Sequence, residues 1–216
     1  MRHMKKKIVF IVIAVAAAVV GAICFFNGSV VDTADAIYPA SEETGGIAEK
    51  VIGDPDTASV VLYEYADFGC SHCADWNKTI NELLEKYEGK IALVFRNYDL
   101  GFKNGPAAAR AATAAHIQGY FKEYKDLLFA NQAEWYYGSA SELEELFVEY
   151  FNEVSDGKGD VDKFKEDMKS DAVKKRLKFE QRMGKKVNLH GTPLFRIDGE
   201  QIDLGKLVET IENKLK

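Results

Sequence analysis

The chain has 216 residues, of which 47% are hydrophobic and 29% are charged, with four prolines. This composition is typical of a globular protein with a sizeable core and excludes a disordered or fibrous chain. After Lys7 the chain carries 24 basic against 34 acidic residues, because four cations (Arg2, Lys5, Lys6 and Lys7) precede that point. An acidic domain argues against nucleic-acid binding, so no nucleic-acid partner is expected.

The N-terminus has the pattern of a membrane anchor. Residues 1–7 form a basic flank, and residues 8–26 contain no charged side chain. At about 1.5 Å per residue this run is long enough to cross a hydrocarbon core of roughly 30 Å. The basic flank predicts a cytoplasmic N-terminus, with the remainder of the protein outside the cytoplasm. We therefore expect a single-pass cell-membrane protein with an extracytoplasmic domain.

Two details qualify this anchor. Ala34-Asp35-Ala36 has the small-x-small form of a signal-peptidase site, but it lies far beyond the apolar run, so an uncleaved signal anchor is favoured. Cys24 is expected to be a membrane-buried thiol, since Ile23 precedes it where lipoprotein cleavage needs a small residue.

Residues 27–46 are rich in Gly, Ser, Thr and acidic residues, a composition that predicts a flexible linker.

The first part of the folded domain is expected over residues 47–104. Residues 60–65 and 91–95 are short β-branched or aromatic runs that suit buried strands. Between them, apolar residues repeat at helical spacing as far as Tyr87. This predicts a β-α-β unit in which Cys70-Ser71-His72-Cys73 lies at the carboxyl end of the first strand, where active sites of α/β sheets collect.

Two thiols at this spacing can form a disulfide with each other and reopen it. A helix N-terminus stabilises a thiolate at Cys70, and a protonated His72 would add a positive charge beside it. Such settings give cysteine pKa values of roughly 3.5 to 7.5 against about 8.5 for a free thiol. Cys70 and Cys73 are the only cysteines of the expected exported part, which indicates reactivity rather than a structural crosslink.

Other uses of the Cys-x-x-Cys spacing fit less well. Haem attachment requires His directly after the second cysteine, where this chain has Ala74. A zinc site needs two further ligands, and His116 and His190 do not form a His-x3–5-His pair. Zinc binding stays open as the weaker alternative, and no metal is expected.

Residues 105–186 are almost wholly helical in pattern and predict an inserted helical domain. Residues 187–216 return to strands. A β run at 194–197 leads through Asp198-Gly199, a two-residue hairpin turn, into Gln201 and Ile202, and an amphipathic helix closes the chain. The order β-α-β, helical block, β-β-α predicts an α/β protein with a thioredoxin fold. An all-helical domain is inserted in its middle, and a transmembrane segment precedes it.

Several motifs together resemble the DsbA-like thiol-disulfide oxidoreductases, especially their membrane-anchored Gram-positive type. The resemblance covers about residues 51–216. In chain order the motifs are Val51–Asp56, Glu64–Cys73, Phe95–Tyr98, Ala108–Ala112 with Gln118-Gly119, Leu128–Gln132 with Trp135, and Gly191-Thr192-Pro193.

The resemblance implies a role for each matching position. Cys70 would be the exposed nucleophile and Cys73 the shielded resolving thiol. Pro193 would be a cis-proline facing the dithiol, leaving the Thr192 backbone free to pair with a client strand. Glu64 would be a buried acid that assists proton transfer, or else a polar residue on an exposed strand face. Many members of the family have Pro where this chain has Ser71, so the redox potential can differ from that of its relatives.

The resemblance implies an extracytoplasmic oxidase that passes a disulfide to reduced exported proteins. It needs no cofactor other than the redox-active disulfide of Cys70 and Cys73. Reoxidation would come from a quinone-linked membrane partner, either DsbB-like or resembling vitamin K epoxide reductase. Two alternatives stay open: a reductase or isomerase of the same fold, and a thioredoxin-fold binding or metal-binding protein without catalysis.

Overall fold

The computed structural model describes residues 33–216. The predicted membrane span at residues 8–26 and Cys24 lie outside this range. Within the described range, the helices are too short or too polar to span a bilayer.

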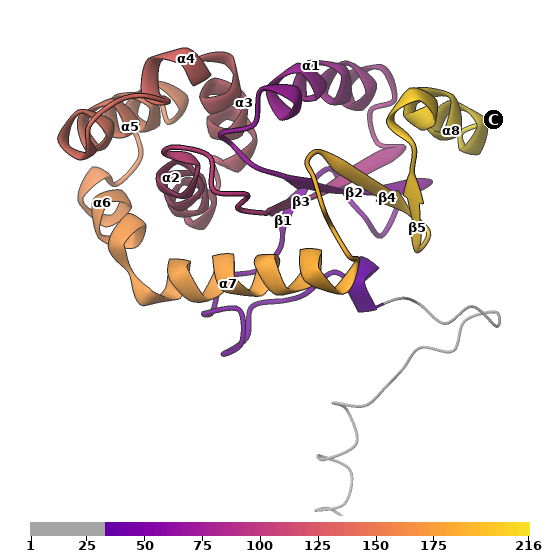
Figure 1. The fold of residues 1–216 in the computed structure, drawn as a ribbon, viewed down its shortest axis with the longest axis horizontal. Helices are drawn as coiled ribbons and strands as arrows, with labels where there is room; N and C mark the ends of the chain where they lie inside the picture. The colour runs from indigo at the N-terminus through magenta and orange to yellow at the C-terminus, as the bar shows by residue number, and fades with distance from the viewer. Residues whose placement is uncertain (1–32) are drawn as a thin grey trace, which may run out of the picture. The chain divides into compact units, whose positions relative to one another are not determined.

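A five-stranded mixed sheet forms the centre of the domain (Figure 1). Its strands are β1 (Lys50–Ile52), β2 (Val60–Ala66), β3 (Ile91–Asn97), β4 (Leu194–Ile197) and β5 (Glu200–Ile202). They lie in the order β1-β3-β2-β4-β5, with β2 parallel to β3 and the other pairs antiparallel. All seven residues of β3 are buried, as expected for a central strand covered on both faces.

Helices cover both faces of this sheet. Figure 1 shows α1 (Ser71–Lys86) and α8 (Leu207–Lys214) above it and α7 (Asp171–Lys186) below it. The remaining helices gather beside the sheet. They are α2 (Gly105–Ile117), α3 (Phe121–Ala130), α4 (Gln132–Trp135), α5 (Ala140–Val154) and α6 (Val161–Lys169). This arrangement confirms the thioredoxin-like fold with a large helical part between β3 and β4.

The helical part and the sheet share one hydrophobic core around the dithiol. Phe68, just before the cysteines, stacks on Phe129 of α3 with ring centroids 4.9 Å apart. The same ring lies 5.4 Å from Phe95 of β3. Cys70 and Cys73 belong to this cluster of buried residues. Burying each aromatic side chain contributes about 1.5–3 kcal/mol, so the packing that stabilises the helical part also holds the dithiol loop.

The predicted hairpin turn is confirmed. Asp198 and Gly199 join β4 to β5 with φ angles of 52° and 85°. Two successive positive φ angles are typical of a type I′ turn, whose twist matches that of the flanking strands. Strand β1 was not expected from the sequence, because three residues are too few to show a period.

Buried charges connect the sheet to α7. Glu180 of α7 binds both Lys50 of β1 and Arg176 one turn earlier on its own helix. Glu49 in turn binds Arg176 and, at 3.1 Å, Arg96 of β3. All five side chains are almost completely buried. Loss of either glutamate would leave buried cations uncompensated in the interior, which is strongly destabilising.

The segment before β1 is packed on the domain, whereas the sequence predicts a flexible linker as far as residue 46. Ala34 is fully buried, and the backbone oxygens of Ala34 and Ala36 accept hydrogen bonds from the Arg96 guanidinium. Asp35 binds Arg196 of β4 at 2.7 Å. Cleavage after Ala36 would remove all of these contacts.

We predict that Asp35→Ala lowers the free energy of unfolding by about 3 kcal/mol, because the ion pair between Asp35 and the buried Arg196 guanidinium is lost. Glu43→Ala is the matched control, since Glu43 lies in the same segment but forms an exposed ion pair with Arg182. It should cost less than about 1 kcal/mol. Chemical denaturation of both variants measures the difference, and equal losses would contradict a structural role for the segment.

Candidate active site

The two cysteines lie where β2 leads into α1. Cys70 is the N-cap residue of α1, with φ −86° and ψ 121°, and no side chain caps the helix. The first N–H groups of the helix are therefore available to a negative charge at this point. Both cysteines are thiols in the structure. Cys73 is 0% exposed and Cys70 only 5%, so the expected exposed nucleophile is nearly covered.

The two thiols have opposite pKa shifts. A hydrogen bond from the Cys73 thiol lowers the pKa of Cys70 to about 5, helped by the backbone N–H groups of Cys73 and His72, against the effect of burial. Burial raises the pKa of Cys73 far above its ordinary value, and its hydrogen bond to Cys70 raises it further. The reduced pair is thus a thiolate at Cys70 and a thiol at Cys73.

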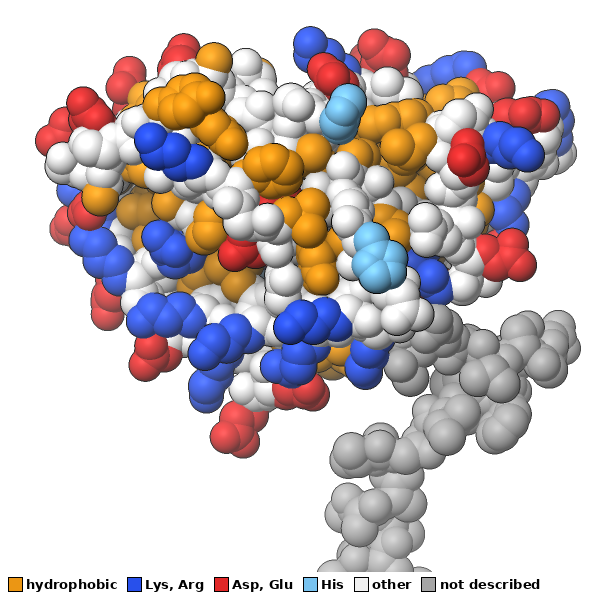
Figure 2. Space-filling model, viewed as in Figure 1, with side chains coloured by type: hydrophobic (Ala, Val, Ile, Leu, Met, Phe, Trp, Pro, Cys, Tyr) orange, Lys and Arg blue, Asp and Glu red, His pale blue; other side chains and the backbone are white. Residues whose placement is uncertain are grey.

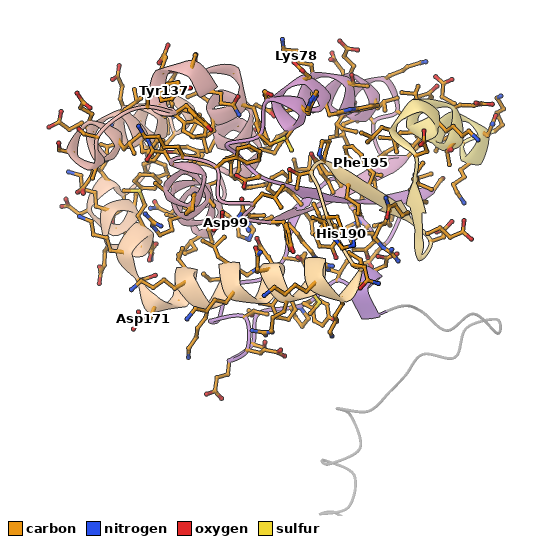
Figure 3. The ribbon with its side chains drawn as sticks, viewed as in Figure 1. Lys78, Asp99, Tyr137, Asp171, His190 and Phe195 are labelled. Atoms are coloured by element: carbon orange, nitrogen blue, oxygen red, sulfur yellow. The ribbon has the colours of Figure 1, made fainter. Side chains whose placement is uncertain are left out.

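The loop before β4 closes over this pair. The Thr192-Pro193 peptide bond is cis, and the Thr192 oxygen lies 3.4 Å from Cys70 Sγ, where it accepts a hydrogen bond from the protonated thiol. Thr192 Oγ1 is buried and has no hydrogen-bond partner within residues 33–216. Figure 3 shows the two ends of this region, His190 on the loop after α7 and Phe195 on β4.

An open groove of about 450 Å³ runs beside Pro193. Its lining comes from the loop before β4, from β4 and β5, and from the residues that follow β5. The lining residues are Asn188, His190, Gly191, Pro193, Leu194, Gln201, Ile202, Asp203, Leu204 and Gly205. The groove offers backbone and apolar surface directly beside the cis-proline.

His72 lies in the first turn of α1 with its side chain exposed. The contribution that the structure assigns to this residue is its backbone N–H, which helps to lower the pKa of Cys70. The electrostatic effect expected of the imidazole stays a prediction.

Glu64 is buried on β2, 1% exposed, rather than on an exposed strand face. Burial raises the pKa of its carboxyl to about 7, opposed by the positive charge of Lys125 and supported by the negative charge of Asp126. Its Oε1 has no hydrogen-bond partner in the described part of the chain. A carboxyl with this pKa can both give and take a proton near neutral pH.

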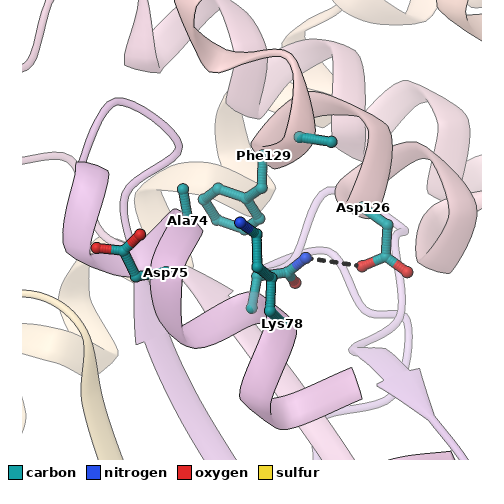
Figure 4. Close-up of a pocket in the computed structure, with 7 residues that line it drawn as sticks. Ala74, Asp75, Lys78, Asp126 and Phe129 are labelled. Carbon is teal, nitrogen blue, oxygen red and sulfur yellow. Dashed lines mark hydrogen bonds between the residues drawn. The ribbon is translucent and has the colours of Figure 1, made fainter. Parts of the chain in front are cut away.

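The charged neighbours of Glu64 come from α3. Lys125 is fully buried and binds the side chains of Asn77 on α1 and Asp126. Asn77 also donates to Asp126 at 3.1 Å, the contact drawn in Figure 4. Asn77 and Asp126 border a cavity of about 110 Å³ between α1 and α3. It is lined by Ala74, Asp75, Asn77, Lys78, Asp126, Phe129 and Ala130.

Sequence reasoning missed Lys125 and Asp126. The one available signal was the position of Lys125 on the apolar stripe of its helix, between Phe121 and Leu128 at helical spacing. A lysine there has to find a buried partner, but the sequence does not say which. The described residues contain no group of three or more His, Cys, Asp or Glu side chains that could hold a metal ion.

Comparison with known proteins agrees with the fold. The thioredoxin family model matches residues 46–216, so the chain belongs to the thioredoxin family. It is 28% identical over 170 residues to the probable disulfide bond formation protein D of Bacillus anthracis, covering 74% of this chain and 76% of that protein. This relative confirms the resemblance to the DsbA-like, thiol-disulfide oxidoreductase type of thioredoxin-fold protein.

Similar structures share the fold at low sequence identity. BdbD from Bacillus subtilis has a TM-score of 0.66 at 21% identity, over 83% of this chain and 97% of that one. MdbA of Actinomyces oris, a thiol-disulfide oxidoreductase, has a TM-score of 0.64 at 24% identity, over 84% and 92%. The chain is also 31% identical over 151 residues to the Na(+)/H(+) antiporter NhaA of Herminiimonas arsenicoxydans, but it spans only 22% of that protein.

We predict that Cys70 reacts with iodoacetamide with half-maximal rate near pH 5, while Cys73 stays unreactive at neutral pH. Mass spectrometry of the alkylated peptides measures both rates.

The depressed pKa of Cys70 also stabilises the reduced fold above the unfolded-state pKa of about 8.5, and this stabilisation is lost as the pH falls towards 5. The stability advantage of reduced protein over Cys70→Ser should therefore shrink from pH 8.5 to pH 5, and a constant advantage would contradict the assignment.

Proposed function

We propose that the protein donates disulfides to reduced exported proteins through Cys70 and Cys73. The observation that carries this proposal is the asymmetry of the pair, a stabilised thiolate at the helix N-terminus beside a buried thiol of high pKa. A stabilised thiolate favours the reduced form, which makes the oxidised form a strong oxidant. Donation of a disulfide is therefore the favoured direction.

The reaction begins with the Cys70–Cys73 disulfide. A client thiolate attacks Cys70 Sγ, forming a mixed disulfide and releasing Cys73, which takes up a proton because burial disfavours its thiolate. A second client thiolate then attacks the client sulfur of the mixed disulfide, and Cys70 leaves as the stabilised thiolate. The client loses two electrons and gains a disulfide, and the protein retains the reduced pair.

Three further residues would assist these steps. Glu64, with a pKa near neutral, would give or take the proton of Cys73. Pro193 has no N–H, and the Thr192 backbone beside Cys70 would pair with an extended client segment. The groove next to Pro193 would accept the neighbouring client residues.

The surface around the site favours a protein client. Hydrophobic side chains gather in the middle of the face shown in Figure 2. The large hydrophobic residues most exposed in the described part of the chain include Leu100, Phe102, Tyr137 and Leu204. Phe102 lies directly against the backbone of Gly69, one residue before Cys70. Apolar surface beside a reactive thiol suits an unfolded chain better than a small polar substrate.

We place this activity outside the cytoplasm, with the domain tethered by the predicted span at residues 8–26. The basic flank and the two-cysteine composition of the exported part support this location. A quinone-linked membrane protein, DsbB-like or resembling vitamin K epoxide reductase, would reoxidise the pair.

Oxidised protein mixed with a reduced, unfolded two-cysteine client should transfer its disulfide stoichiometrically. Free thiols counted on both proteins measure the transfer. Cys73→Ser lacks the disulfide and should not oxidise the reduced client. Its Cys70 thiolate should instead attack the disulfide of an oxidised client, releasing one client thiolate, and remain in a mixed disulfide because Cys73 is not there to resolve it. Cys70→Ser should do neither. Failure of the oxidised wild type to oxidise the client, together with reduction of an oxidised client by the reduced form, would favour a reductase instead.

Replacing His72 with Ala should raise the pKa of Cys70 and make the pair a weaker oxidant, because the positive charge of a protonated imidazole would be lost. Lys78→Ala is the matched control, since it removes a cation further along the same helix. An unchanged thiolate titration in the His72 variant would show that the backbone N–H, not the imidazole, carries the effect of this residue.

A further inference from the structure

Asp67 is a buried acid beside the active site to which the mechanism assigns no step. It lies between β2 and α1 and is 1% exposed. Its Oδ1 accepts the N–H of Gly69 at 2.9 Å, and its Oδ2 accepts the N–H of Leu100 at 2.8 Å. Its backbone oxygen accepts the N–H of Cys70 at 3.0 Å. The residue thus binds the nucleophile's own loop and the loop between β3 and α2, residues 98–104, at once.

Close packing leaves this carboxylate little room to move. A Cβ added at Gly105, the first residue of α2, would lie only 2.5 Å from Asp67 Oδ1. A Cβ added at Gly69 would lie 2.4 Å from Phe102 Cβ. Two glycines therefore allow the loops to approach each other, and the positive end of α2 lies beside the carboxylate.

We propose that Asp67 is a positioning residue for the redox reaction. By tying the loop of Cys70 to the β3–α2 loop and to the start of α2, it holds Cys70 Sγ between the first N–H groups of α1 and the Thr192 carbonyl. This inference rests on the proposed redox function of the Cys70–Cys73 pair. Without the carboxylate, two backbone N–H groups would lose their partners, and the loop would have to rearrange to satisfy them.

The negative charge of Asp67 and its hydrogen bonds have opposite effects on the stability of the Cys70 thiolate. Burial chiefly raises the pKa of Asp67, to about 6, against the effect of the hydrogen bonds from Leu100 and Gly69. The negative charges of Asp99 and Cys70 raise it further. Two negative charges repel, so the carboxylate by itself disfavours the Cys70 thiolate. Removal of the charge alone would therefore stabilise the thiolate, whereas loss of positioning would destabilise it. The sign of the change separates the two roles.

The test is alkylation of Cys70 at pH 5 in the full-length protein, with peptide mapping to separate Cys70 from Cys24 and Cys73. Asp67→Ala should slow the reaction by about fivefold, the fall in the thiolate fraction at pH 5 when the pKa of Cys70 rises by one unit from about 5. Gly105→Ala should slow it in the same direction although it keeps the Asp67 side chain, because the new Cβ displaces the carboxyl group.

The control is Asp99→Asn, which removes a charge from the same β3–α2 loop; Asp99 is labelled in Figure 3. Its carboxylate binds Gly101, not the loop of Cys70, so the alkylation rate should stay within about twofold of wild type. Unchanged or faster alkylation in both folded variants, Asp67→Ala and Gly105→Ala, would overturn the proposal.

Two further results keep the outcome unambiguous. If Asp67→Ala does not fold, the proposal is tested by the Cys70 alkylation rate of Gly105→Ala and by hydrogen exchange in the wild type. The Gly69 and Leu100 amides should be protected there, and exchange as fast as in an open chain would contradict the bridge. A wild-type Cys70 that titrates like an ordinary thiol would instead contradict the proposed function itself.

Discussion

The hydrogen bond from the Cys73 thiol to the Cys70 thiolate is the interaction on which the rest of the site depends. It requires one sulfur at the open N-terminus of α1 and the other one turn further, inside the protein. The first position favours a negative charge, and the second opposes one. The pair therefore holds a single proton, and its reduced state is stabilised.

Three segments far apart in the sequence build this arrangement. Strand β2 and α1 supply the cysteines, the loop before β4 brings Thr192 to the nucleophile, and α3 packs Phe129 against Phe68 just before the dithiol. The same α3 places Lys125 near Glu64, so the helical part contributes electrostatics as well as packing. The inserted helices are consequently part of the candidate site and not only a cover for it.

The parts that could be predicted from sequence are those set by local chemistry. The start of α1 at the dithiol follows from the change of hydrophobic period, and the Asp198-Gly199 hairpin from two residues that tolerate positive φ. Buried polar contacts could not be predicted, because a Lys125 or an Asp35 shows its partner only after the chain has folded. Residues 34–36 were expected to belong to a linker, because three small or polar residues show no hydrophobic period. In the structure, oxygen atoms of this segment bind the guanidinium groups of two buried arginines, Arg96 and Arg196.

The most direct test of the account is the redox equilibrium of the full-length protein with glutathione, followed by thiol trapping of Cys70 and Cys73. A Cys70 thiolate as stable as its helix-terminal setting indicates should give a potential at or above roughly −180 mV, near the oxidising end of the range for such dithiols. A potential near about −270 mV would contradict the account, because that value belongs to a thioredoxin-like reductant.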